Sequence, residues 1–192
     1  ATATPYSSGA LTQTTYYKRG ARTSVDAIVY TGSIKITVES SIGGTISGSA
    51  TVCANTNSTT LSLSGNTGTI TKWQSSTQAD FSTAIDVVNI TSGLTATNLT
   101  ATTYYRAVVQ LNSCAIVNSS TSTVTVNALP VISGTLSVFV NLTTALSGNG
   151  TPGGTPWATT NGSVATVSNV GVVTGVSSGT VTITYTNNNG CA

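Results

Sequence analysis

With 192 residues, the chain is long enough for one large β domain or two small ones. Charged side chains make up 5% of it, its formal net charge is +2, and it contains no histidine. The sparse positive charge argues against a nucleic-acid partner, and the missing histidine excludes Ser-His-Asp and Cys-His catalysis and histidine-containing metal sites. The abundance of threonine and serine favours strands and turns over helices, and a hydrophobic content of 39% suffices for thin two-layer cores.

The first pattern along the chain is a repeat. The stretch LTQTTYYK at 11–18 returns as LTATTYYR at 99–106, an offset of 88 residues, and at the same offset Ile36 falls on Val124. Two strands and the spacing between them are therefore duplicated. Residues 1–40 correspond to the last two or three strands of a truncated first copy. Because half a sandwich leaves edges unpaired, we expect the remaining strands to come from a longer chain or from a partner.

The second copy, residues 41–128, reads as a complete antiparallel sandwich of short strands separated by Gly, Asn and Ser. Trp73 stands where a sandwich core holds its tryptophan. Leu99, followed six residues later by Tyr105, resembles the tyrosine corner of fibronectin type III and immunoglobulin-like domains. The alternation places Tyr105 in the core and Tyr104 on the outer face, where its ring could stack on a ligand.

The third segment, residues 129–192, follows the short linker NALP and contains the runs SVATV, GVVTGV and GTVTITYT between Gly- and Ser-rich turns. Together with the preceding PWATTNG, this order resembles the bacterial Ig-like group 2 domain of invasins and other surface proteins. The resemblance implies another β-sandwich. Trp157 fits its core, and stacking on a sugar is the alternative role.

Three cysteines leave one without an obvious partner. Cys53 and Cys114 bracket the second copy, which suits a disulfide formed in an oxidising compartment better than a metal site, since no Cys-x-x-Cys pair exists. Cys191 is then a free thiol, a buried thiol, or bonded outside these residues.

Four acids remain as candidates for chemistry: Asp26, Glu39, Asp80 and Asp86. Only Asp80 and Asp86 lie close in sequence, flanking FSTAI. A catalytic pair and a weak Ca²⁺ or surface role are the alternatives, and solvated loop acids are the simplest interpretation. We therefore expect no catalytic residue, no cofactor and no metal site, and no enzyme activity. No apolar run approaches the roughly 18 residues of a membrane span, so we expect no membrane insertion.

The stretch VCANTNSTTLSLSGNTGTITKWQSS, followed by LTATTYYRAVVQLNSC, is similar to the Ig-like repeats of very large Bacteroidetes surface proteins, including SprB-type gliding-motility adhesins exported by type IX secretion. This resemblance implies tandem Ig-like sandwiches on the bacterial cell surface, associated with the outer membrane. It implies a stalk that presents adhesive contacts to an extracellular surface or polysaccharide, with the secretion and gliding machinery engaged by other regions. The alternative is a carbohydrate-binding or spacer module of an invasin-like adhesin or a secreted hydrolase.

Overall fold

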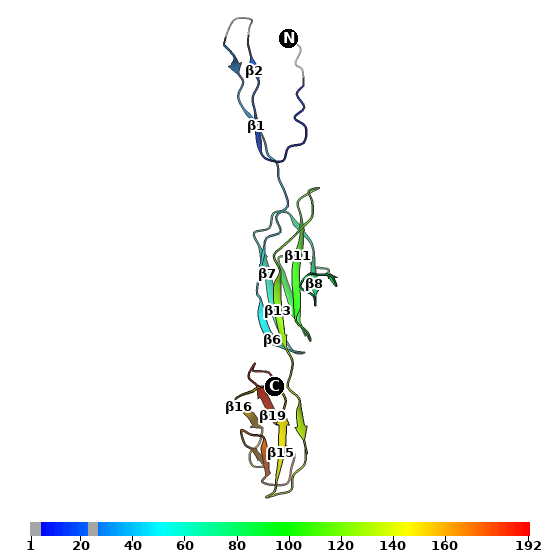
Figure 1. The fold of residues 1–192 in the computed structure, drawn as a ribbon, viewed down its shortest axis with the longest axis vertical. Helices are drawn as coiled ribbons and strands as arrows, with labels where there is room; N and C mark the ends of the chain where they lie inside the picture. Colours follow the sequence, from blue (N-terminus) through cyan, green and yellow to red (C-terminus); the bar gives the residue numbers. More distant parts are fainter. Residues whose placement is uncertain (1–4, 23–26) are drawn as a thin grey trace.

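The computed structural model describes residues 5–22 and 27–192, and every regular element within them is a β-strand. Figure 1 shows three groups of strands in a row along the long axis: an N-terminal hairpin, a middle sandwich and a C-terminal sandwich. The expected all-β fold of tandem Ig-like sandwiches is confirmed. Its elongation arises because each sandwich packs its own core.

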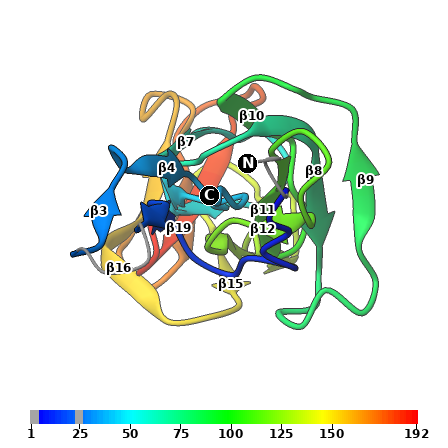
Figure 2. The same cartoon turned by 90° about the horizontal axis from the view of Figure 1, so that it is seen from above.

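The middle sandwich has a three-stranded and a larger sheet. The first sheet has the order β10-β7-β5 and consists of β5 (Thr45–Ser47), β7 (Ser58–Ser64) and β10 (Gly93–Thr97). The second has the order β6-β13-β11-β8-β9, with β12 added beside β11. Its members are β6 (Ala50–Cys53), β8 (Thr69–Ser76), β9 (Ile85–Val87), β11 (Thr103–Gln110), β12 (Val117–Asn118) and β13 (Ser122–Asn127). Viewed along the long axis, β9 lies at the outside of this sandwich (Figure 2).

Alternation along the strands builds the middle core. In β7 the burial pattern alternates strictly, so that Leu61 and Leu63 point inward between exposed Ser and Thr side chains. Leu94 and Ala96 of β10 join the same layer. They face Trp73, Tyr105, Ala107, Val109 and Val124 of the opposite sheet. Val108 is also buried but is not part of this cluster, and at the register shift between Val108 and Val109 the unpaired extra residue is Thr71 of β8.

The first strand of the middle sandwich crosses from one sheet to the other. β5 pairs antiparallel with β7, and three residues later β6 pairs in parallel with β13. Gly48 stands at the crossing with φ +102, and a Cβ there would collide with the carbonyl oxygen of Thr60. The crossing brings Cys53, the last residue of β6, to the end of the middle sandwich that faces the C-terminal one.

The C-terminal sandwich is smaller. One sheet has the order β14-β15-β18-β17 and the other pairs β16 with β19. These strands are β14 (Ile132–Gly134), β15 (Thr143–Gly148), β16 (Pro152–Thr159), β17 (Ala165–Val167), β18 (Val172–Gly175) and β19 (Ile183–Asn187). Their core is Leu146, Trp157, Ala165, Val173 and Tyr185. The Trp157 and Tyr185 rings lie 4.8 Å apart, centroid to centroid, and the Tyr185 hydroxyl donates a hydrogen bond to the Gly150 carbonyl at 3.2 Å.

The N-terminal hairpin reproduces the β11–β13 hairpin of the middle sandwich. It consists of β1 (Thr15–Tyr17), β2 (Gly20–Ala21), β3 (Val29–Tyr30) and β4 (Ile34–Ile36). β1 pairs with β4 as β11 pairs with β13, and β2 pairs with β3 as β11 pairs with β12; all five residue pairs coincide at the offset of 88. The sequence repeat is therefore also a repeat of strand register.

The two hairpins differ in what covers them. In the middle sandwich Tyr105 and Val124 are buried beneath the β10-β7-β5 sheet. At the equivalent positions of the N-terminal hairpin, Tyr17 is half-buried against the ring of Tyr6, 5.8 Å away, and Ile36 is exposed. The hairpin thus presents apolar side chains that its counterpart packs into a core.

Candidate functional site

The directions of the strands determine which cysteines can meet. β6 runs parallel to β13, and β13 runs antiparallel to β11, so β6 and β11 run in opposite directions. Cys53 ends β6, whereas Cys114 follows the end of β11, and the two residues therefore lie at opposite ends of the sandwich. The predicted disulfide between Cys53 and Cys114 is wrong for this reason: bonded cysteines need Cα atoms less than about 7 Å apart.

Cys53 instead forms a disulfide with Cys191, and the two Cα atoms lie 5.6 Å apart across a sequence separation of 138. This corrects the second expectation, that Cys191 is a free thiol, a buried thiol, or bonded outside these residues. The bond joins the end of the middle sandwich to the last turn of the C-terminal one. Figure 1 shows the C-terminus at the junction between the two sandwiches rather than at the far end of the molecule.

Asn57 supports the Cys53 side of the junction. Its side-chain amide donates to the carbonyl oxygens of Cys53, at 2.7 Å, and Leu99, at 2.8 Å, and its Oδ1 accepts from the Leu99 N–H at 2.9 Å. One half-buried side chain therefore ties the loop after β6 to the turn between β10 and β11. The Asn55 N–H donates to the same Leu99 carbonyl, which completes the connection.

Asn187 supports the Cys191 side. It is buried at the end of β19, and its Oδ1 accepts from the backbone N–H groups of Asn189, at 3.0 Å, and Cys191, at 3.1 Å. Its own N–H donates to the Cys191 carbonyl at 3.0 Å. These bonds fold residues 188–191 into a compact turn, which delivers the Cys191 sulfur to the junction with only 1% of the residue exposed.

The linker provides the second covalent connection across the junction. β13 ends at Asn127, and the chain enters the C-terminal sandwich at Val131, whose N–H donates to Asn149 Oδ1 at 2.6 Å. Asn127 lies directly beside Cys53 in the parallel β6–β13 pair, so linker and disulfide leave the middle sandwich side by side. Two attachments at neighbouring points restrict hinging and twisting far more than one flexible linker does.

Cys114 occupies the opposite end of the middle sandwich, close to the segment that arrives from the N-terminal hairpin. Its thiol is a free, half-buried group that lies 3.6 Å from the Glu39 carbonyl oxygen. The neighbouring Leu111 N–H donates to Ser41 Oγ at 2.9 Å. Cys114 therefore sits at the boundary between hairpin and sandwich. Asp26, which stands at its equivalent position one repeat earlier, lies outside the described residues.

The aromatic candidates are mainly core residues. Trp73 is fully buried, and its indole N–H donates to the Thr91 carbonyl at 3.0 Å. Tyr105 is buried, which raises the pKa of its hydroxyl, and Leu99 packs against the same core. The Tyr105 ring packs as the tyrosine-corner resemblance implies, while the hydrogen bonds that hold the turn at Leu99 come from Asn57.

The two candidates for ligand stacking offer little open ring surface. Trp157 is 8% exposed and packs on Tyr185, so its face is already occupied. Tyr104 lies half-buried on the outer side of β11, between Ser76 of β8 and Thr123 of β13. Neither residue is among those that line the cavity of the C-terminal sandwich described below.

The candidate acids have structural partners. Asp86 accepts hydrogen bonds from Lys72 Nζ at 2.7 Å and from Gln74 Nε2 at 2.8 Å. Both bonds lower the pKa of its carboxyl, and the bond from Lys72 has the larger effect. The Ser82 N–H donates to Asp80 and lowers the pKa of that group. Both carboxyls are thus held ionised at the surface, which is the opposite of what a general acid requires. Among residues 5–22 and 27–192, no three His, Cys, Asp or Glu side chains cluster as metal ligands would.

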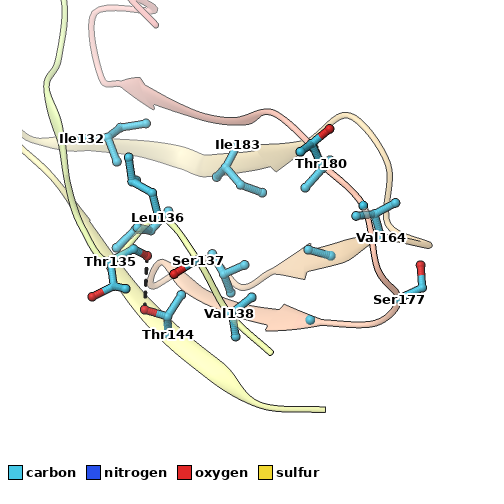
Figure 3. A pocket seen from close by; sticks show the side chains of 16 residues that line it. Ile132, Thr135, Leu136, Ser137, Val138, Thr144, Val164, Ser177, Thr180 and Ile183 are labelled. Carbon is cyan, nitrogen blue, oxygen red and sulfur yellow. Dashed lines mark hydrogen bonds between the residues drawn. The ribbon is translucent and has the colours of Figure 1, made fainter. Parts of the chain in front are cut away.

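A cavity of about 600 Å³ opens in the C-terminal sandwich between residues 135–138, Val164 and the start of β19. Figure 3 shows Leu136, Val138, Val164 and Ile183 around it, with Thr144 Oγ1 donating to the Thr135 carbonyl at 3.4 Å. Its lining is aliphatic side chains, Ser, Thr and Gly, so it contains no titratable or nucleophilic group beyond hydroxyls. In residues 5–22 and 27–192 the structure contains no helix with the length and hydrophobicity of a membrane span.

Comparison with known proteins divides the chain at the linker. Residues 42–128 match the family described as a domain of unknown function (DUF8696), and residues 130–191 match the bacterial Ig-like domain (group 2). No curated protein matches the chain. Of the solved structures, seven chains are similar. One is described as Drosophila OTK, extracellular domains 3-5, with 12% identity, a TM-score of 0.34, and coverage of 74% of this chain and 58% of that one. This chain therefore spans a little over half of that relative's length.

Proposed function

We propose that this chain is a non-enzymatic segment of an extracellular surface protein, in which Ig-like sandwiches placed end to end act as a stalk. The observation that carries the proposal is the covalent junction: Cys53–Cys191 and the linker together join two separately packed sandwiches. A disulfide of this kind persists in oxidising surroundings, which supports an extracellular location. The match of residues 130–191 to a bacterial Ig-like domain supports the same setting.

The finer proposal is a gliding-motility adhesin of the SprB type from Bacteroidetes, exported by type IX secretion and held at the outer membrane. It is supported by the resemblance of the repeat sequence and by the repetition of strand register at 88 residues. In this role the stalk presents contacts to an extracellular surface or polysaccharide, and the secretion and gliding machinery binds elsewhere. An invasin-like adhesin or a spacer of a secreted hydrolase is the alternative.

Small-angle X-ray scattering on the oxidised chain tests the stalk. A compact globule of this length has a radius of gyration of about 16 Å, and we expect a value well above this with a distance distribution skewed to long separations. A radius near the compact value would contradict the proposal. Reduction of the disulfide should leave the two sandwiches folded but broaden the distribution, because only the linker then restrains the junction.

A glycan array separates a stalk from a carbohydrate-binding module. A pure stalk leaves every glycan unbound, whereas the alternative predicts binding that Tyr104→Ala abolishes. Trp157→Ala is unsuitable for this test because Trp157 belongs to the C-terminal core and its loss would unfold that sandwich.

A further inference from the structure

We infer that the Cys53–Cys191 disulfide keeps tension out of residues 54–190, which hold most of the middle sandwich and all of the C-terminal one, so that pulling on the two ends of the chain cannot unravel these residues. The inference concerns the same junction as the proposed stalk and depends on the stalk role only for its biological use. That tension bypasses residues 54–190 follows from the covalent bonds alone.

Force applied between residues 1 and 192 follows the shortest covalent path. From the N-terminal side it passes through the hairpin and along β5 and β6 to Cys53, crosses to Cys191, and leaves through Ala192. Everything between the two cysteines is a closed loop attached at one point of that path. The loop contains the strands β7 to β13 of the middle sandwich and all of the C-terminal sandwich.

The part of the middle sandwich that does lie on the path has little length to release. β5 and β6 are extended already, and a strand rises about 3.3 Å per residue, close to the limit for a fully stretched chain. They are also anchored where the path enters: Ser41 Oγ accepts from the Leu111 N–H at 2.9 Å, and Ile42 exchanges two backbone hydrogen bonds with Thr67, each 3.0 Å. Tension therefore tightens these strands along their own axis.

Without the disulfide, the path runs through the whole chain. Tension then pulls the start of β6 and the end of the parallel strand β13 in opposite directions, which shears this pair apart and opens the middle core, and it reaches β19 at the far end of the sequence. The covalent loop closes a separation of 138 residues, so its release adds roughly 450 to 500 Å of contour length. The same bond that fixes the junction thus decides whether tension can unravel residues 54–190.

Single-molecule force spectroscopy tests this on the full chain, held between marker domains attached at residues 1 and 192. In the oxidised protein we expect release of at most roughly 175 to 190 Å, the contour length of residues 1–53. After addition of dithiothreitol the same molecules should release the further 450 to 500 Å in steps that correspond to the two sandwiches. Release of the whole chain from oxidised protein, before reduction, would overturn the inference.

Two variants separate the disulfide from general thiol effects. Cys114→Ser removes the free thiol and should behave as the unmodified protein with and without reductant. Cys191→Ser should release the full length without reductant. If Cys191→Ser fails to fold, reduction of molecules already folded and tethered still decides the question. Scattering tests the stalk independently. An elongated chain whose full contour length is released while oxidised contradicts only the bypass of residues 54–190. A compact chain in which these residues resist extension contradicts only the stalk.

Discussion

The Cα atoms of Cys53 and Cys191 lie 5.6 Å apart although 138 positions separate them in the sequence, and the bond between their sulfurs joins two sandwiches with separate cores. Each cysteine is placed by an asparagine, Asn57 on one side and Asn187 on the other. At this junction, local hydrogen bonds therefore hold the two cysteines in position for a disulfide between residues far apart in the sequence.

Peptide mapping under non-reducing conditions should recover one linked pair, Cys53 with Cys191, and an alkylatable Cys114. The alkylating reagent should label Cys114 before reduction, and Cys53 and Cys191 only after reduction. Recovery of a Cys53–Cys114 linkage would contradict the strand directions, because these two residues lie at opposite ends of the middle sandwich.

Cys191→Ser should destabilise the chain. In the chain-entropy model, closing a loop this long raises the free energy of the unfolded state by about 5 kcal/mol. Removal of a native disulfide typically lowers the free energy of unfolding by about 2 to 5 kcal/mol. Urea unfolding followed by tryptophan fluorescence measures the change, since Trp73 lies in one core and Trp157 in the other. Cys114→Ser is the matched control and should leave the unfolding midpoint nearly unchanged.

Asn57→Ala should cost the middle sandwich about 2 to 3 kcal/mol of unfolding free energy, because three hydrogen bonds are lost. Asn57→Asp keeps an acceptor for the Leu99 N–H but places a charge against two carbonyl oxygens, so it should not restore stability. The neighbouring exposed Ser58→Ala is the control. A loss for Asn57→Ala no larger than that for Ser58→Ala would show that the loop is held by other contacts.

Tyr105 should make stability fall at alkaline pH. Burial raises the pKa of its hydroxyl above the usual value of about 10, so the unfolded chain loses this proton at a lower pH than the folded one. The stability that this group contributes is fully present below about pH 10 and is lost as pH rises through the folded pKa. Thermal unfolding between pH 8 and 11 measures the slope, which Tyr105→Phe should flatten. An unchanged slope in that variant would assign the alkaline loss to other groups.

Much of the fold can be predicted from residue order. The alternation of Leu61 and Leu63 with polar residues predicts β7 and its inward face, and the stretch TTYYRAVVQ predicts β11 with Tyr105 in the core. The repeat at 88 residues extends to the pairing of strands, as Thr15 with Ile36 and Thr103 with Val124 show. Local side-chain periodicity suffices for these predictions because each strand exposes one face to water.

The candidate site is less accessible to such reasoning. Asn57 and Asn187 are two among many asparagines in a chain rich in turn residues, and their spacing from Cys53 and Cys191 is the only sequence signal: each lies four positions from its cysteine. That spacing allows a side-chain amide to reach the backbone of a turn and support its geometry. It predicts a turn held by a side-chain amide, but it does not predict which cysteine the turn brings into bonding distance.

The strands, their inward faces and the repeated hairpin can be predicted from residue order, because they depend on neighbours along the chain. The disulfide pairing follows only from the arrangement of the strands in space. Cys53 and Cys114 bracket one repeat and look like partners, yet the parallel pairing of β6 with β13 sends them to opposite ends. Cys191 reaches Cys53 because the last turn of the next sandwich folds back to the junction. A covalent bond forms between atoms that are close in space, and in this chain closeness in space depends on strand direction rather than on distance along the sequence.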